Sequence, residues 1–237
     1  MRRCDVLLLG TGPRATGFAP VHAALRRCGL TYRESVSPAA LRTVPCRLAL
    51  VIGCDRIIPT AWLAKAPQGV VILHSSALPY GRGWAPLYHA ITERQLRHTV
   101  TMFFATAKVD AGQIIATASC AMHPLETIGT LRHKTALMIT GLVARYAAAL
   151  VAGRLTGTPQ RGRGSYNRRR TPADSRITPG QKLNCLLPVL RALPEAHPAY
   201  FVLRGVRCTL RLTVEEDKIF NPARFRYRII NRARRKL

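Results

Sequence analysis

The sequence predicts an α/β fold with a mainly parallel sheet and a small β-rich C-terminal domain. Short apolar runs alternate with helical patterns over residues 1–152, which is typical of a parallel sheet covered on both faces. After residue 180 the pattern changes, and shorter segments favour strands. Hydrophobic residues make up 48% of the 237 residues, so the chain can bury a core and is not disordered throughout.

In the first part of the chain, a buried strand is expected wherever a continuous apolar run ends in glycine or a polar residue. Such runs predict strands at residues 5–10 (DVLLLG), 47–53 (RLALVIG), 70–73, 99–105 and 113–117. Between these runs, the spacing of apolar residues predicts helices at residues 19–28, 86–96 and 125–152, and a helical turn at residues 60–65. The first helix should stop at Gly29, and the turn should begin after Pro59.

The second part of the chain contains one predicted helix, at residues 181–193, and strands at 200–203, 207–214 and 224–230. In the last strand arginine alternates with apolar residues, so one face would be basic and the other apolar. A stretch rich in glycine, proline and arginine precedes this part. We therefore expect a domain at residues 1–152, a basic linker at residues 153–180 and a small domain at residues 181–237.

Charge is the most unusual feature of the composition. The chain carries 37 basic residues, of which 31 are arginine, against 11 acidic residues, for a net charge of +26. The net charge is +11 over residues 1–152 and +15 over the shorter remainder. Such a charge attracts polyanions such as RNA, although a codon bias toward arginine would produce the same composition.

The seven cysteines predict neither a disulfide framework nor a metal site, because their number is odd and no two are spaced as C-x-x-C. This usage is typical of a reducing compartment, so we expect a cytoplasmic protein or one of an organelle matrix. No apolar run approaches 18 residues, and the run at residues 6–9 is too short for a secretory signal. We therefore expect no membrane span.

A glycine-containing turn follows the first predicted strand. Residues 10–15 (GTGPRA) fit the G-x-G-x-x-A pattern of a dinucleotide-binding turn, and Glu34 stands about where an acid would contact a ribose. Pro13, however, has no backbone N–H to offer a pyrophosphate. A nicotinamide-dependent enzyme is therefore an alternative that rests on this turn alone.

A histidine and an aspartate stand where open α/β sheets place functional side chains. His74 ends a buried strand and begins the loop HSSALPYGRGWAP, and Asp110 follows 36 residues later in VDAGQII. If the two strand ends are neighbours, a hydrogen-bonded pair of this kind can act as acid and base. For an isolated histidine, a structural role would be the simpler interpretation.

The residues around this pair carry a resemblance to a known family. The motifs are His74-x-Ser76-x-Leu78-Pro79, Arg82-Gly83-x-x-Pro86, Ala90-Ile91, Val100-Thr101 and Asp110-x-Gly112-x-Ile114-Ile115. In order and spacing they resemble the folate-dependent formyltransferases, which include methionyl-tRNA formyltransferase, glycinamide ribonucleotide formyltransferase and the amino-sugar N-formyltransferases. Residues 157–160 (GTPQ) and 170–177 resemble the linker of this family, and the whole resemblance covers roughly residues 45–212.

The resemblance implies a Rossmann-like catalytic domain over residues 1–152 and a reaction that uses no metal. In the family, an acceptor amine attacks the formyl carbon of the co-substrate 10-formyltetrahydrofolate, and a histidine and a carboxylate stabilise the oxyanion and move protons. Carried over by position, these two residues are His74 and Asp110. The residues implied for the folate and substrate loop are Ser76, Leu78, Pro79, Arg82, Gly83 and Gly112.

One position departs from the family pattern. The family asparagine two residues before the histidine is Ile72 here, and isoleucine cannot donate a hydrogen bond to an oxyanion. Unless Ser75, Tyr88 or His89 compensates, the resemblance implies a slow or inactive enzyme. The region at residues 33–47 is also shorter than in the tRNA-acting branch, which would remodel one edge of the sheet.

The basic charge favours methionyl-tRNA as the acceptor, with translation initiation and one-carbon metabolism as the setting. The candidate RNA-binding residues are Arg168, Arg169, Arg170, Arg224, Arg226 and Arg228. Two alternatives remain open, namely an amino-sugar nucleotide as the acceptor and an RNA-binding descendant with impaired catalysis. The sequence does not set the oligomeric state, for which a monomer is the simplest expectation.

Overall fold

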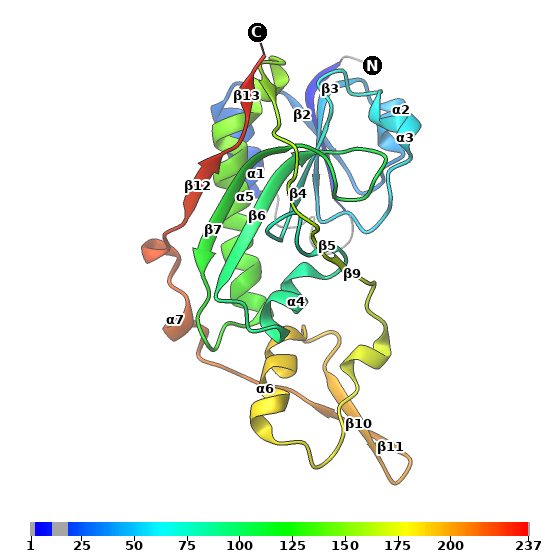
Figure 1. Ribbon diagram of the computed structural model, residues 1–237, viewed down its shortest axis with the longest axis vertical. Helices are drawn as coiled ribbons and strands as arrows, with labels where there is room; N and C mark the ends of the chain where they lie inside the picture. The colour runs from blue at the N-terminus through cyan, green and yellow to red at the C-terminus, as the bar shows by residue number, and fades with distance from the viewer. Residues whose placement is uncertain (1–2, 11–18, 237) are drawn as a thin grey trace.

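The computed structural model describes residues 3–10 and 19–236 of the chain. Figure 1 shows an elongated molecule, with a large sheet and its helices in the upper part and a smaller unit of one helix and a hairpin at the lower end. The yellow-green segment that follows α5 crosses the sheet on its way from the upper part to this unit.

The large sheet has seven strands in the order β12-β7-β6-β4-β3-β1-β2. Pairing is parallel from β2 through β1 and β3 to β4, and antiparallel from β4 through β6 and β7 to β12. The strands are β1 (Cys4–Leu9), β2 (Tyr32–Ser35), β3 (Cys46–Ile52), β4 (Val70–His74), β6 (Arg97–Phe104), β7 (Ile114–Ala121) and β12 (Arg228–Asn231). The predicted α/β class is confirmed, and the parallel strands form one half of a mixed sheet.

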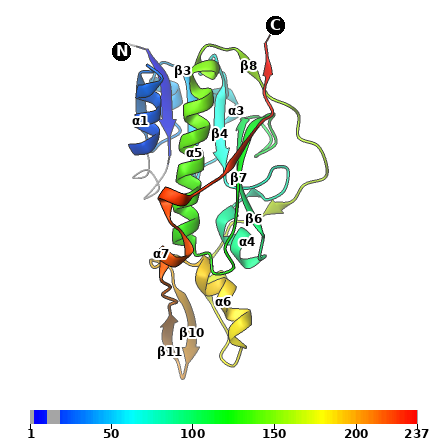
Figure 2. The same ribbon diagram turned by 90° about the vertical axis from the view of Figure 1, so that its left-hand side faces the viewer.

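Helices cover both faces of this sheet (Figure 2). They are α1 (Ala19–Arg27) and α5 (Ile128–Val151) on one face, and α2 (Ala40–Thr43) and α3 (Thr60–Leu63) on the other. Successive side chains of a strand point to opposite faces, so β1 sends Val6 and Leu8 toward α5 and Leu7 toward α2. Two covered faces explain why the predicted strands are apolar without interruption.

Helix α5 is the central element of the core. It begins with a capping box, in which the side chains of Thr127 and Thr130 each accept a hydrogen bond from the other residue's backbone N–H. Its length and composition would also suit a membrane span. Here, however, Met138, Leu142 and Tyr146 bury one side of the helix against the sheet, so α5 serves as a core helix.

The smaller unit consists of α6 (Leu183–Ala192), β10 (Ala199–Leu203) and β11 (Val206–Leu210). Ile177, Leu190 and Ala199 form a core cluster of its own. Helix α6 packs against α4 (Pro86–Thr92), which connects the unit to the large sheet and its helices. Short elements complete the chain, namely β5 (Arg82–Gly83), β8 (Leu155–Thr156), β9 (Tyr166–Asn167), η2 (Pro172–Ser175), α7 (Glu216–Ile219), η3 (Pro222–Arg224) and β13 (Arg234–Arg235).

The C-terminal tail returns to the large sheet. Strand β12 pairs antiparallel with β7, and β13 pairs with β8 (Figure 1). Phe225, Tyr227 and Ile229 pack against the main core, and the arginines that alternate with them are exposed. The predicted alternation is present, but the final strand extends the large sheet instead of pairing with β10 or β11. The predicted domain boundary at residue 180 stays a prediction. A domain of residues 181–237 would include β12, which pairs with β7 of the large sheet.

Some element boundaries differ from those expected. Strand β2 was not predicted, because its sequence YRES is mostly polar and lies at a sheet edge. Helix α4 ends at Thr92 instead of residue 96, and Arg94 has a left-handed φ of 53° that the helix cannot continue. Strand β7 continues to Ala121, through small residues that carry no strong apolar signal.

His98 is a buried histidine that fastens β6 to α5. Its Nε2 lies 2.8 Å from the hydroxyl of Thr135, which donates its own hydrogen to the carbonyl of Leu131. The His98 ring therefore donates from Nε2 in this contact. Burial, aided by the positive charge of Lys134, lowers the pKa of His98 to about 3. The folded protein thus holds this ring neutral at pH values where the unfolded chain protonates it.

We expect the free energy of unfolding to fall as the pH falls from about 6.5 toward 3, because only the unfolded chain binds a proton at His98 in this window. The contribution is about 1.4 kcal/mol per pH unit. Urea unfolding of the wild type and of His98→Gln at several pH values measures it, since carboxylates titrate equally in both. Stability curves that stay parallel below pH 6 would contradict the assignment.

Candidate active site

His74 is the last residue of β4 and lies at the C-terminal end of the parallel half of the sheet. Its side chain is 10% exposed, and its Nε2 lies 2.9 Å from the carbonyl oxygen of Gly81. Because a carbonyl only accepts, the ring hydrogen of this contact is on Nε2. Ile72 is two residues earlier in the strand and therefore points to the same face of the sheet.

Asp110 lies in the turn between β6 and β7 and faces His74. One of its carboxylate oxygens is 3.8 Å from His74 Nδ1, and this side chain is 11% exposed. That distance is longer than a hydrogen bond and within reach of an ion pair. The same oxygen accepts a hydrogen bond of 2.8 Å from the backbone N–H of Gly83. The structure thus brings the two predicted catalytic residues close together, with both side chains almost buried.

The loop between His74 and Arg82 is held by hydrogen bonds to its neighbours. The Thr101 hydroxyl donates to the carbonyl of Ser76 at 2.6 Å and accepts from the N–H of Leu78 at 3.4 Å. The peptide bond between Leu78 and Pro79 is cis. At the far side of the loop, the N–H of Gly81 donates to the hydroxyl of Ser165 at 2.8 Å. The predicted loop residues therefore lie beside His74 in a defined conformation.

Gln160 connects this loop to the turn that carries Asp110. Its amide nitrogen donates to the carbonyls of Asp110 and Gly112, each at 2.9 Å. Its amide oxygen accepts a hydrogen bond of 2.7 Å from Arg82, which also donates to the Asp110 carbonyl at 3.2 Å. Sequence analysis matched residues 157–160 to the family linker but gave Gln160 no role in the site.

Two glycines of the site are required by space or backbone conformation. A Cβ on Gly112 would lie 1.6 Å from the carbonyl oxygen of Phe104, so only glycine fits in this turn. Gly83 has a φ of 89°, and a Cβ there would lie 2.5 Å from the carbonyl of Asn167. Each of these glycines adjoins a contact that positions Asp110, which gives a physical reason for the glycines in the motif.

The family model for formyl transferase matches residues 14–140, which is just over half of the chain. The chain belongs to the formyl transferase family. It is 31% identical over 198 residues to a methionyl-tRNA formyltransferase of Phenylobacterium zucineum and 32% identical over 208 residues to one of Acidothermus cellulolyticus. These alignments cover 78% and 85% of this chain, but 64% and 63% of the relatives, so the chain spans less than two thirds of their length.

Solved structures of this family share the fold. A methionyl-tRNA formyltransferase from Clostridium thermocellum matches with a TM-score of 0.73 at 16% identity, over 98% of this chain and 99% of that one. A sugar N-formyltransferase from Shewanella sp FDAARGOS_354 matches with a TM-score of 0.71 at 17% identity, over 90% and 98%. A formyltransferase from Anoxybacillus kamchatkensis, in complex with UDP-4,6-dideoxy-4-formamido-L-AltNAc and tetrahydrofolate, matches at 0.56 and 22%, over 70% and 85%. These likenesses confirm the formyltransferase fold and leave the acceptor open.

The glycine-containing turn that suggested a dinucleotide site falls at residues 10–15, which lie mostly outside the described residues. Its proposed acidic partner, Glu34, is on β2 with its carboxylate 2.9 Å from Nε2 of His22. Within residues 3–10 and 19–236 there is no cluster of three histidine, cysteine or acidic side chains that could hold a metal ion.

Of the three side chains considered as substitutes for the missing asparagine, Ser75 and His89 line a cavity of about 230 Å³ beside the His74 loop. His89 Nδ1 lies 3.2 Å from the carboxylate of Glu93. Its Nε2 and the hydroxyl of Ser76, which lines the same cavity, are both buried and have no hydrogen-bond partner within the part of the chain that the structure describes. Tyr88 lies apart, beneath the guanidinium of Arg170 at 3.8 Å. Ser76 and His89 therefore offer polar atoms to a molecule in this cavity.

The structure divides the candidate RNA-binding arginines into two groups. In the linker, Arg168 hydrogen-bonds the carboxylate of Asp174, which lowers the pKa of that carboxyl, and Arg169 stacks 4.8 Å above the ring of Trp84. Arg170 is partly buried, whereas Arg168 and Arg169 keep these contacts at the exposed surface, so RNA binding by the three stays a prediction. The arginines at 224, 226 and 228 are exposed, and within the described chain none of them forms an ion pair with a carboxylate.

We expect Gln160→Ala to loosen the site, because it removes the bonds from Asp110 and Gly112 to the linker and one bond from Arg82. The loss should be about 1–3 kcal/mol, or roughly 3–10 °C in melting temperature. Trypsin should also cleave sooner after Arg82. Gln181→Ala, which removes one local bond to the N–H of Thr178, is the control and should stay near the wild type. An unchanged melting temperature and unchanged cleavage for Gln160→Ala would show that the contact does not hold the site.

Proposed function

We propose that this chain transfers a formyl group from 10-formyltetrahydrofolate to the amino group of methionyl-tRNA. The observation that carries the proposal is the pair of His74 and Asp110, 3.8 Å apart at the end of β4, in a chain of the formyl transferase family. The relatives above are methionyl-tRNA formyltransferases, and tetrahydrofolate is bound in one structure of similar fold. Such an acceptor would give the protein a role in translation initiation, in the cytoplasm or an organelle matrix.

The reaction requires one bond to form, one to break and two proton movements. The acceptor nitrogen bonds to the formyl carbon, and the carbonyl oxygen gains a negative charge in the tetrahedral intermediate. The bond from that carbon to N10 of the folate then breaks, N10 takes up a proton and the acceptor nitrogen loses one. An imidazole N–H can stabilise the oxyanion, and a neighbouring carboxylate can accept the proton of the attacking amine. His74 and Asp110 supply these two groups in nearly buried positions.

The Gly81 carbonyl competes with the substrate for His74. In the described conformation it accepts the Nε2 hydrogen of the ring at 2.9 Å. A formyl oxygen that uses the same donor must displace this carbonyl, so the loop at residues 75–83 has to shift when substrate binds. The hydroxyl of Ser165, which holds the N–H of Gly81, makes the linker a partner in that shift.

Ile72 leaves the oxyanion with one donor fewer than the family pattern provides. It lies on the same face as His74, and its partly buried side chain packs against an apolar cluster that includes Val51 and Val70. The removal of one oxyanion donor lowers kcat by about 100- to 1000-fold in other enzymes. We therefore propose a slow enzyme, unless Ser76 or His89 takes this role from the neighbouring cavity.

We expect Ile72→Asn to raise the kcat of formyl transfer by at least about tenfold, with a smaller change in KM, because the new donor acts on charge that develops in the transition state. Formyl transfer to methionyl-tRNA from 10-formyltetrahydrofolate measures it. Ile72→Val is the matched control and should leave kcat unchanged. Asparagine in a half-buried apolar setting lowers stability, so melting temperatures of both variants are compared first. If a folded Ile72→Asn has the wild-type kcat, another group already fills the position.

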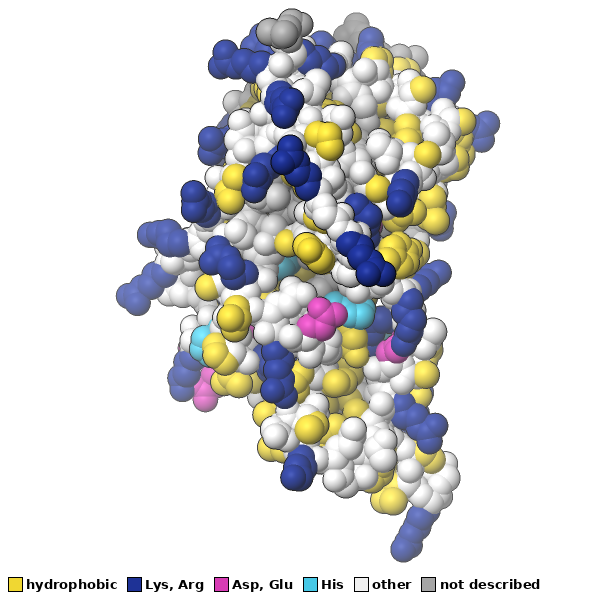
Figure 3. Space-filling view, in the orientation of Figure 1, with side chains coloured by type: hydrophobic (Ala, Val, Ile, Leu, Met, Phe, Trp, Pro, Cys, Tyr) yellow, Lys and Arg dark blue, Asp and Glu magenta, His cyan; other side chains and the backbone are white. Residues whose placement is uncertain are grey.

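The acceptor is inferred from charge. Lys and Arg side chains are scattered over the visible face of the molecule from top to bottom, and acidic side chains on it are few (Figure 3). On the tail, Arg224, Arg226 and Arg228 project outward because the residues between them pack against the main core. A row of exposed guanidinium groups of this kind suits the phosphate backbone of a folded RNA.

We expect the joint change of Arg224, Arg226 and Arg228 to glutamine to weaken tRNA binding. The slope of the logarithm of the binding constant against the logarithm of the salt concentration should become shallower by roughly two to three, since each phosphate contact that is lost no longer releases its counterion on binding. Filter binding over a range of salt concentrations measures both quantities, and folate binding should be unchanged. Arg211→Gln, an exposed change outside the tail, is the control. If the triple variant binds tRNA as the wild type does, and the wild type formylates an amino-sugar nucleotide instead, the acceptor is the sugar.

A further inference from the structure

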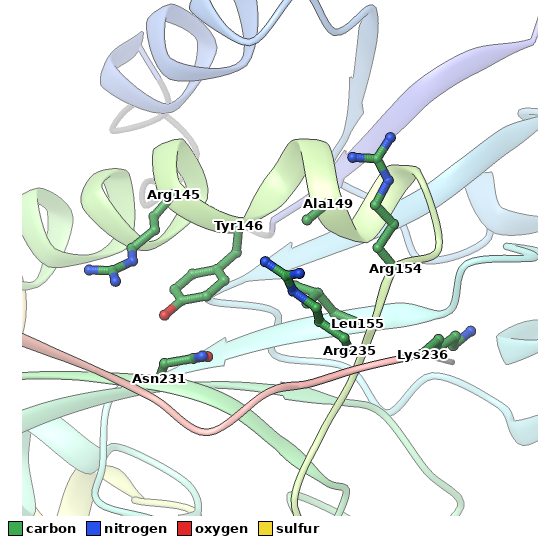
Figure 4. A pocket seen from close by; sticks show the side chains of 8 residues that line it. All are labelled: Arg145, Tyr146, Ala149, Arg154, Leu155, Asn231, Arg235 and Lys236. Atoms are coloured by element: carbon green, nitrogen blue, oxygen red, sulfur yellow. The ribbon is translucent and has the colours of Figure 1, made fainter.

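A second cavity lies between the end of α5 and the C-terminal tail, toward the end of the sheet opposite to His74 (Figures 1 and 2). We call it the tail cavity. Its volume of about 470 Å³ is within the roughly 300–1,000 Å³ of small-molecule sites. In Figure 4, side chains from α5 and from the tail extend into the space between these elements. Its polar lining residues are Arg145, Tyr146, Arg154, Asn231, Arg235 and Lys236.

The tail cavity is lined by four basic side chains, and among the described residues that line it there is no acidic one. Arg145, Arg154, Arg235 and Lys236 are all exposed. Among the residues that the structure describes, none of the four forms an ion pair with a carboxylate. Like charges gathered around one space repel each other, and a bound anion would relieve this repulsion.

The backbone holds these charges in place. Arg235 on β13 pairs with Leu155 on β8, and the N–H of Lys236 donates to the carbonyl of Arg154 at 3.0 Å. The turn after α5 and the tail, about 80 residues apart in the sequence, are therefore joined at the cavity by main-chain hydrogen bonds. The fold thus places residues of both segments, Arg154 on the one and Arg235 and Lys236 on the other, in the lining of the same cavity.

Tyr146 supplies the observation that distinguishes this cavity from an ordinary basic surface. The residue is 5% exposed, and its buried hydroxyl has no hydrogen-bond partner among residues 3–10 and 19–236. An unpartnered buried hydroxyl lowers stability by about the free energy needed to desolvate it, so such groups are rare unless a ligand completes them. Burial also raises the pKa of this phenol, which therefore keeps its hydrogen and can donate.

The donors of the tail cavity match a phosphate group. Guanidinium groups bind phosphate oxygens through two parallel N–H groups, and a lysine ammonium binds them as a point charge. Asn231 uses its amide oxygen to accept the N–H of Ala233, which leaves its N–H groups for another acceptor. The polar groups that remain at the cavity are thus predominantly donors.

We propose that the tail cavity is a phosphate-binding site, in which the hydroxyl of Tyr146 and the cations of α5 and β13 hold the phosphate group of a ligand. The phosphate belongs either to the backbone of an RNA or to a small phosphorylated molecule. The proposal does not depend on formyl transfer, because the site is separate from His74 and Asp110.

Titration calorimetry with inorganic pyrophosphate at fixed ionic strength tests the site. We expect wild-type protein to bind pyrophosphate and Arg235→Gln to bind it about tenfold more weakly, since a charge-assisted hydrogen bond is lost. Arg211→Gln removes the same charge outside the cavity and should bind as the wild type does. If Arg211→Gln and Arg235→Gln weaken binding equally, pyrophosphate responds only to net charge and the proposal is wrong.

Tyr146→Phe separates a binding role from a structural one. We expect it to weaken pyrophosphate binding several-fold while it leaves the melting temperature unchanged or raises it, because no residue in the described part of the chain hydrogen-bonds the hydroxyl. Tyr227→Phe is the matched control. It removes a hydroxyl that donates to the carbonyl of Leu137, so it should lower stability slightly and leave pyrophosphate binding alone. Unchanged binding in Tyr146→Phe would overturn the role of this hydroxyl.

Competition with tRNA identifies the source of the phosphate. If pyrophosphate displaces tRNA, and Tyr146→Phe and Arg235→Gln weaken both ligands, the site binds an RNA backbone phosphate. If the variants weaken pyrophosphate alone, the natural ligand is a small phosphorylated molecule. If the wild type binds no pyrophosphate and the variants bind tRNA as it does, the tail cavity is not a phosphate site.

Discussion

The position of the candidate catalytic carboxylate depends on a chain segment 50 residues further along the sequence. After α5 the chain crosses the sheet, and Thr158 exchanges two backbone hydrogen bonds of 2.8 Å with Ile114 at the start of β7. Gln160 then holds the carbonyl of Asp110, and β9 pairs with β5 in the loop that follows His74. The site is therefore assembled from β4, the turn before β7 and the linker, and it is complete only when all three segments are in place.

Much of the fold could be predicted because its strongest signals are local. Strands β1, β3 and β4 are continuous apolar runs, and covered faces on both sides of a sheet produce such runs. Helix α5 shows a long apolar stripe for the same reason. Strand β2 was missed because Tyr32–Ser35 is mostly polar. The alternation at residues 224–230 predicted the last strand but not its partner, because β12 pairs with a strand more than 100 residues away and the pattern within one strand does not identify the strand beside it.

The candidate site was predictable to a similar degree. His74 and Asp110 stand in a motif of fixed spacing, and Gly112 is marked by the same motif. Gln160 lies in residues 157–160, which resemble the family linker, but a stretch rich in glycine, proline and arginine looks like a flexible connection and gives no sign of a role in the site. Its function in the structure comes from main-chain contacts that only the folded chain shows. The contact of the Arg170 guanidinium with the ring of Tyr88 was not predictable either, because it joins two segments far apart in the sequence, and the RNA-binding role of Arg170 stays a prediction.

The return of the tail also covers one edge of the large sheet, because β12 pairs with β7 there. Without Arg228–Asn231, the eight-residue strand β7 would present a row of unpaired N–H and carbonyl groups to solvent. Such an uncovered border is a template onto which a second molecule can add a strand, and this leads to aggregation. The other border ends in β2, which has four residues and carries Arg33 and Glu34. The protein thus protects one side of its sheet by covering it and the other by keeping it short and charged.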